Sequence, residues 1–316
     1  MNTTISAAEA MQQTKEMLTA SGQRRKNVDR MMTVVIWFCF ALALAPLVSL
    51  LWTVLGNGIG RMSIDFLTLS MRNVFPGDPG GGIYHAIVGT LIITGFAALI
   101  SVPVGVLTAI YLVEYGRGPL ARAVTFFVDV MTGIPSIVAG LFVVALFTLI
   151  LGPGARIGVM GAVALSVLMI PVVVRSSEEM LKLVPNELRE ASYALGVPKW
   201  LTILRVVLRT SVAGLTTGVL LAVARVIGET APLLIAVGVT DSFNVNPFDG
   251  RMMTLPVFAY REYSQGNAPC REGDLGCVTD IAFQNAWGAA LTLIAIVMLL
   301  NIVGRLVNRW FAPKLR

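Results

Sequence analysis

The chain has 316 residues, of which 56% are hydrophobic and only 13% are charged. Because a soluble domain carries about 25% charged residues, this composition excludes an ordinary soluble protein and indicates a membrane protein. The net charge of +6 does not indicate nucleic-acid binding, since the basic residues are spread between long apolar runs and form no basic stripe.

The chain begins with a polar segment, residues 1–30, followed by 25 uncharged residues at 31–55. A helix needs about 20 apolar residues to cross the hydrocarbon core of a bilayer, so 31–55 predicts the first transmembrane span. This run is too long for the apolar core of a cleavable signal peptide. We therefore expect the first span to be retained and residues 1–30 to form a separate N-terminal segment.

Further apolar runs predict about six spans in all, and hence an all-α membrane protein. Four of these runs are uncharged, and a fifth, 211–240, carries Arg225, Glu229 and the helix-breaking Pro232. The four uncharged runs are 86–113, 130–151, 157–174 and 281–304.

The distribution of Lys and Arg predicts the orientation of these spans. With the N-terminus in the cytoplasm, the inner segments hold seventeen basic residues and the outer segments hold six. The positive-inside rule then places both termini in the cytoplasm. The expected organisation is a transmembrane domain at 31–308, with an inner segment at 175–209 and an outer loop at 241–280, followed by a cytoplasmic tail at 309–316.

The three cysteines agree with this orientation. Cys39 lies in the first span, where it serves as a small apolar residue. Cys270 and Cys277 both fall in the outer loop, on the oxidising side of the membrane, where a disulfide is possible. Two free thiols remain the alternative, because a spacing of seven residues permits a bridge without requiring one.

The inner segment 175–209 carries helix punctuation and an amphipathic pattern. Ser176 with Glu179 fits a capping box, Pro185 marks a break, and Gly196 followed by Pro198 fits a helix end. Two short helices are expected, at about 177–184 and 187–195. Such a surface can lie on the membrane, pack on its own bundle, or dock into a partner, and periodicity does not choose among these. Its apolar positions are Leu181, Val184, Leu188, Ala191 and Leu195.

The sequence contains no motif for catalysis. It lacks a phosphate-binding loop, a zinc-protease motif and a nucleophile elbow, and its only histidine is His85, at the outer edge of the second span. We interpret His85 as an interfacial polar residue, since no Cys or His cluster accompanies it. The chain is therefore expected not to be an enzyme and to bind no metal or cofactor itself.

Arg225 and Glu229 are the clearest candidates for function, because a charge near the bilayer centre is costly. They are four residues apart and can share one helical face, so an ion pair that only holds the helix in place is the alternative. The sequence from Gly228 to Pro232 predicts a helix break, which is tolerated mainly beside a cavity. Since the guanidinium fork of Arg fits tetrahedral oxyanions, we interpret this site as part of an anion path.

Three further residues join this candidate translocation path. Arg175 ends the fourth span, and extension of its side chain to the interface is the open alternative. Pro135 predicts a kink in the third span, beside Ser136. Asp129 is assigned to the inner interface and not to the path.

Residues 190–209 resemble the cytoplasmic signature of the permeases of ABC importers. Glu190, Ala191 and Gly196 match it, as does Leu208 after the nine-residue spacing, whereas Ser192, Val206 and Arg209 depart from it. In that family this segment forms a coupling helix that fits a cleft on an ATP-hydrolysing subunit. The resemblance therefore implies a partner ATPase, which would bind ATP-Mg, and assigns Glu190, Ala191 and Gly196 to coupling.

Residues 133–140 and 225–232 resemble the two membrane motifs of phosphate-transport permeases of the PstA type, within a similarity that runs from about residue 86 to the C-terminus without the loop 241–280. This resemblance implies a type I importer permease fold in a bacterial inner membrane. It also implies a homologous second permease subunit, two ATP-binding subunits and an extracytoplasmic phosphate-binding protein. A permease for another oxyanion, such as sulfate or molybdate, is the main alternative, and an ATPase-independent channel or secondary transporter is a further one.

Overall fold

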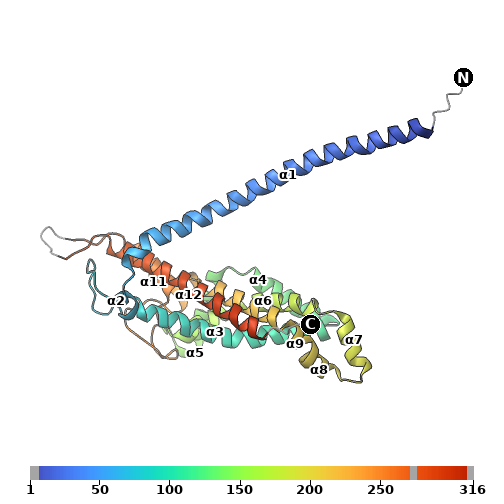
Figure 1. Cartoon of the computed structure of the whole chain (residues 1–316). Coiled ribbons are helices and arrows are strands. Elements are labelled where there is room, and N and C mark those ends of the chain that lie inside the picture. Colours follow the sequence, from blue (N-terminus) through green and yellow to red (C-terminus); the bar gives the residue numbers. More distant parts are fainter. Residues whose placement is uncertain (1–6, 271–275, 312–316) are drawn as a thin grey trace. The chain divides into compact units, whose positions relative to one another are not determined.

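The computed structural model describes residues 7–270 and 276–311, all of whose regular elements are helices. The chain divides into two units, residues 1–56 and residues 57–316, which are treated separately. The described residues of the first unit, 7–56, all belong to one helix, α1 (Ala7–Gly58) (Figure 1). Its apolar stretch contains the predicted first span, but the helix begins already at Ala7, within the segment that we expected to be separate.

The second unit is built around α6 (Gly158–Lys182), the central helix of the bundle (Figure 1). Within its most apolar window, 61% of the residues of α6 are buried, against 22–28% for the other long helices of this unit. α6 packs against α3 (Tyr84–Ile110), α9 (Leu208–Val226), α4 (Pro119–Thr132) and α5 (Ser136–Leu151). Its fully buried side chains include Met160, Leu165, Met169 and Val173.

The described residues contain five helices long and apolar enough to cross a membrane, and up to six when the bent pair α4 and α5 counts as one span. α3 continues into the π-helical turn η2 (Tyr111–Tyr115). α9 is preceded by α8 (Lys199–Thr202) and the π-helical turn η3 (Ile203–Val207). The last span lies in α12 (Ile281–Phe311). The prediction of an all-α membrane protein with about six spans is confirmed.

The third predicted span, 130–151, is not one kinked helix. α4 and α5 meet at 107°, and α4 begins at Pro119, eleven residues before the predicted start. Pro135 lies in the corner just before α5, where its missing N–H costs no helical hydrogen bond. Pro135 therefore correctly predicted a change of direction in this span, but the size of the angle could not be predicted from the sequence.

The expected helix at about 177–184 is also wrong. α6 runs without a break to Lys182, so Ser176 is not an N-cap, and its hydroxyl donates to the carbonyl of Val173 at 3.3 Å. The second expected helix is present as α7 (Asn186–Ala194). It is followed by Gly196, whose φ of +74° lies in the left-handed region that favours glycine.

In the fifth predicted span, 211–240, α9 ends early at Val226 and is followed by the short α10 (Ala231–Ala236). Two segments that join predicted spans on the outer side, 56–85 and the outer loop 241–280, contain short helices. Residues 56–85 contain the turn η1 (Ile59–Arg61) and α2 (Ile64–Thr68), and residues 241–280 contain α11 (Leu255–Gln265). In Figure 1, α7 and α8 lie at one end of the second unit and α2 and α11 at the other, and we call these the α7 end and the α11 end.

Candidate functional site

The packing of α9 on α6 fixes the depth of Arg225. Cβ atoms added at Gly214 and Gly218 of α9 would meet Met180 and Ser176 of α6, so the two helices run antiparallel in register. Seven residues beyond Gly218, Arg225 lies level with Met169. At 1.5 Å per residue this level is roughly 17 to 20 Å from the two ends of α6. Arg225 is therefore near the middle of the bundle.

Arg225 lies in the last turn of α9 and is exposed on the surface of this chain. Glu229 is half-buried in the break between α9 and α10. Among the described residues, the side chains of Arg225 and Glu229 form no ion pair with each other or with any other group. Arg225 is thus a cation near the middle of the bundle that has no ion-pair partner among the described residues.

The two membrane motifs lie against each other. Gly140 of α5 packs on Pro232, the second residue of α10, and a Cβ at Gly140 would lie 2.8 Å from the Cα atom of Pro232. The break after α9 is therefore braced by α5. Pro135 is exposed and Ser136 is half-buried at the start of α5, one turn from Gly140.

Arg175 belongs to a charged cluster closer to the α7 end. Its guanidinium forms ion pairs with Asp129 of α4 and, at 2.8 Å, with Glu178 one turn further along α6. Glu178 also accepts from Lys182 at 2.6 Å. Sequence analysis did not assign Asp129 or Glu178 to the site. The spacing of Arg175 and Glu178 could have suggested their pair, but Asp129 is 46 residues away and gave no such signal.

The residues assigned to coupling are on the surface of the α7 end. Glu190, Ala191 and Gly196 are all exposed, and Ser192 is the only buried residue of α7. Large apolar side chains surround them without cover from this chain, which is unusual for a monomeric surface. These side chains are Leu183, Leu188, Tyr193, Leu195 and Trp200. Of the apolar positions predicted here, Leu181 and Val184 instead face the bundle and are buried.

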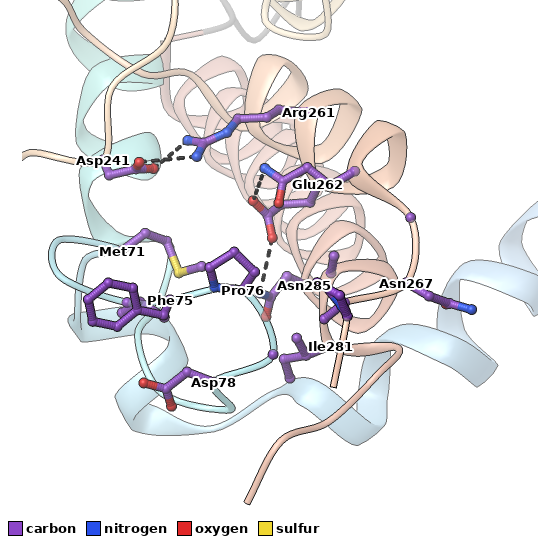
Figure 2. Close-up of a pocket in the computed structure, with 17 residues that line it drawn as sticks. Met71, Phe75, Pro76, Asp78, Asp241, Arg261, Glu262, Asn267, Ile281 and Asn285 are labelled. Atoms are coloured by element: carbon purple, nitrogen blue, oxygen red, sulfur yellow. Dashed lines mark hydrogen bonds and ion pairs between the residues drawn. The ribbon is translucent and has the colours of Figure 1, made fainter. Parts of the chain in front are cut away.

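A cavity of about 330 Å³ opens at the α11 end, between α11, the start of α12 and residues 71–78 (Figure 2). On one side, Arg261 forms a bidentate ion pair with Asp241. On the other, Asn285 donates to Glu262 at 3.2 Å and accepts from Arg61 at 2.8 Å. Burial raises the pKa of Glu262 above its ordinary value, because its carboxylate is only partly compensated by the hydrogen bond from Asn285.

Two further expectations concern the same end of the bundle. Cys270 and Cys277 form a disulfide in the structure, with Cα atoms 5.8 Å apart. His85, which we interpreted as interfacial, is buried: α11 covers it, and its ring packs edge-on against Phe258, with ring centroids 5.7 Å apart. Neither ring nitrogen of His85 has a hydrogen-bond partner among the described residues. Residues 7–270 and 276–311 contain no group of three or more Cys, His, Asp or Glu side chains that could hold a metal ion.

Residues 101–316 match the family described as binding-protein-dependent transport system inner membrane component. The chain is 46% identical over 294 residues to the phosphate transport system permease protein PstA 1 of Mycobacterium tuberculosis. The matched region covers 93% of this chain and 92% of that protein. It is 36% identical over 293 residues to the phosphate transport system permease protein PstA of Yersinia pestis, with 92% of each chain covered.

Solved structures with a similar fold belong to ABC transporters. An inward-facing structure of the MetNI methionine ABC transporter matches with a TM-score of 0.55 at 21% identity, covering 80% of this chain and all of that one. The crystal structure of an amino acid ABC transporter with histidines matches with a TM-score of 0.54 at 17% identity, covering 78% of this chain and 99% of that one. At these identities the likeness shows the fold alone.

Proposed function

The chain belongs to the family of binding-protein-dependent transport system inner membrane components, and we propose that it is the permease subunit of an ATP-driven phosphate importer. It is a multi-pass inner-membrane protein and a transport subunit, not an enzyme. A system of this family works with a binding protein and an ATPase. The finer proposal is a complex with a homologous second permease, two ATP-binding subunits and an external phosphate-binding protein.

We place the α7 end in the cytoplasm and the α11 end outside, so that both termini are cytoplasmic. The excess of Lys and Arg, seventeen against six, supports this orientation. The disulfide between Cys270 and Cys277 also supports it, since that loop then lies in the oxidising compartment.

The observation that carries the proposal is the free Arg225 at mid-depth. A charged side chain at the bilayer centre costs about 2.5–3.5 kcal/mol or more, so such a residue is normally retained for function. Its guanidinium offers paired N–H donors that match the oxygens of phosphate. Because Arg225 and Leu221, one turn before it, are both exposed, the path runs along this face of α9 and is completed by the second permease.

The neighbouring groups shape this path. Glu229 lowers the net positive charge near Arg225, so that the anion binds weakly enough to leave. Pro135 and Ser136 line the path at the start of α5. Arg175 attracts phosphate nearer the cytoplasm, where Asp129 and Glu178 hold its guanidinium in place.

The exposed apolar face of the α7 end supports ATPase coupling. We propose that Glu190, Ala191 and Gly196 enter a cleft on the ATP-binding subunit, which holds the ATP-Mg. Leu188, Tyr193 and Leu195 would then bury the apolar surface that this chain leaves open.

The test is uptake of labelled phosphate into vesicles that carry the whole complex, with and without ATP. Wild type is compared with Arg225→Gln and with Arg72→Gln, which removes the same charge from an exposed position in the segment 56–85. We expect uptake to be lost only in Arg225→Gln, with all subunits still assembled. Unchanged uptake in Arg225→Gln would remove this residue from the path.

The same vesicles separate the alternative functions. ATP-dependent uptake of labelled sulfate or molybdate, with no uptake of labelled phosphate, would assign another oxyanion. Uptake that proceeds without the ATPase would instead indicate a channel or a secondary transporter.

A further inference from the structure

α7 has few apolar contacts with the helices that it must move. The hydrophobic cluster next to α7 comes from α3, the end of α6, the turn that follows α6, η3 and α9. Its buried members are Ala109, Leu181, Val184, Val207 and Leu215. None of the described residues of α7 belongs to this cluster, and the buried Ser192 contributes only a hydroxyl contact to Thr202, at 2.8 Å. α7 therefore adds no buried apolar side chain to the cluster that joins these membrane helices.

Arg189 makes the main polar connection. Its Nη2 and Nε donate to Glu114 Oε1 at 2.8 and 3.1 Å, which joins α7 to η2 at the end of α3. The same guanidinium donates to the carbonyls of Val184 and Leu181, at 2.5 and 3.1 Å, where α6 ends. One side chain thus holds α3, α6 and α7 together.

This ion pair is shielded from water. The side chains of Arg189 and Glu114 are only 12% and 5% exposed, whereas those of Arg175 and Asp129 are 35% and 59% exposed. A shielded pair with several hydrogen bonds holds one geometry, and screening by salt weakens it little. It is therefore able to transmit a displacement.

Glu114 lies in a π-helical turn, an irregularity that is frequent at functional sites. A second connection supports this turn from the other side of α7. Lys199 of α8 donates to the backbone carbonyl of Glu114, and its ammonium lies 4.5 Å from the ring centroid of Tyr115. Both chain segments that flank Gly196 are thereby attached to η2.

We infer that the ion pair between Glu114 and Arg189 is the link through which movement of α7 on the ATPase reaches α3. α3 packs along the central α6, so a displacement of η2 acts on the core of the bundle. Arg189 is a positioning residue in this scheme, since it touches neither ATP nor phosphate. The inference rests on the proposed docking of α7 to the ATPase.

The experiment measures substrate uptake and ATP hydrolysis together, in vesicles carrying the whole complex. The variants are Glu114→Gln, Arg189→Gln and the double variant, with Arg117→Gln as a matched control because Arg117 is exposed and only three residues from Glu114. We expect both single variants and the double variant to assemble and hydrolyse ATP, while the substrate moved per ATP falls by about tenfold, within the usual range of coupling between sites.

The double variant separates transmission from stability. If the pair only stabilises the fold, the defect of a single variant comes from an uncompensated buried charge, and removing both charges restores transport per ATP. If the pair transmits movement, the double variant stays as uncoupled as the single ones, and this is the expected result. A wild-type ratio in the double variant would overturn the inference, while loss of ATP-dependent phosphate uptake in the wild type would instead contradict the proposed function.

Discussion

Gly140 lies directly on Pro232, so the two membrane motifs of this chain, nearly a hundred residues apart, share one contact. Any side chain at Gly140 would meet the backbone of Pro232, with its Cα atom 2.8 Å and its carbonyl oxygen 3.0 Å from the added Cβ. Because backbone atoms cannot rotate away as a flexible side chain can, the two helices would have to separate. The position of the break beside Arg225 therefore depends on glycine at position 140.

Gly140→Ala is predicted to destabilise the chain by about 1–3 kcal/mol, the usual cost of overpacking a well-filled interior, and to lower phosphate uptake. The thermal melting temperature of the purified complex measures the first effect. Gly95→Ala is the matched control, since Gly95 is also within a helix but has open space around its Cβ position. A melting temperature in Gly140→Ala equal to that of Gly95→Ala would contradict this account of the contact.

The approximate number of spans could be predicted from the sequence, because long apolar runs are local signals. The family could be predicted because the motifs at 133–140, 190–209 and 225–232 are also local. It did not predict where α6 ends, since hydropathy falls at Arg175 while the helix continues to Lys182. The charges that lower the hydropathy pair with one another there, which allows the helix to continue. A hydropathy threshold cannot detect this compensation.

Contacts between distant segments were likewise beyond prediction. Asp129 was not assigned to the site, because its partner, Arg175, is on a different helix and 46 residues away. α11 was predicted only as part of a loop, because eleven residues are too few for a membrane span, yet Leu255, Val257 and Phe258 are fully buried. The burial of His85 could not be predicted either, because the residues that cover it belong to α11.

Glu229→Gln is predicted to slow the maximal rate of phosphate uptake while lowering the phosphate concentration needed for half-maximal rate. Removing this carboxylate leaves the charge of Arg225 less opposed, so that the anion is held more tightly and leaves more slowly. Concentration-dependent uptake in vesicles measures both quantities. Asp249→Asn, at an exposed position of the outer loop, is the control, and unchanged kinetics in Glu229→Gln would exclude a balancing role.

Leu195→Asp is predicted to detach the ATPase while leaving the permease in the membrane. Leu195 is 83% exposed beside Gly196, and an aspartate there would place a charge in the proposed apolar interface. Co-purification of the ATP-binding subunit with the tagged permease measures the effect. Ile64→Asp is the control, because Ile64 is 80% exposed but lies at the opposite end of the bundle. Equal recovery of ATPase with both variants would argue against docking at this surface.

The disulfide predicts a simple thiol count. Denatured protein prepared without reductant is expected to show one alkylated cysteine, Cys39, and after reduction all three cysteines of the chain. Mass spectrometry of the alkylated chain gives both numbers. The double variant Cys270→Ser with Cys277→Ser is expected to show one in both conditions. Three alkylated cysteines without reductant would mean that the loop is not bridged.

Glu262 predicts a pH dependence of stability. Burial raises the pKa of its carboxyl above the ordinary value of 4.5, so the folded chain holds this proton at pH values where the unfolded chain has lost it. Stability from this group is then present below about pH 4.5 and is lost as the pH rises through the folded pKa. The nearby charges of Arg261 and Asp241 act on it in opposite directions, and they pair with each other.

Glu262→Gln removes this titration but keeps an oxygen that can accept the hydrogen bond from Asn285. The variant is therefore expected to melt at a higher temperature than wild type at pH 7 and at a similar temperature near pH 4.5. Melting of the purified complex across this range tests the sign, with Asp65→Asn, an exposed carboxylate at the same end, as the control. If Glu262→Gln were less stable than wild type at pH 7, the ionised carboxylate would stabilise the folded state. Burial would then not be the dominant effect on its pKa.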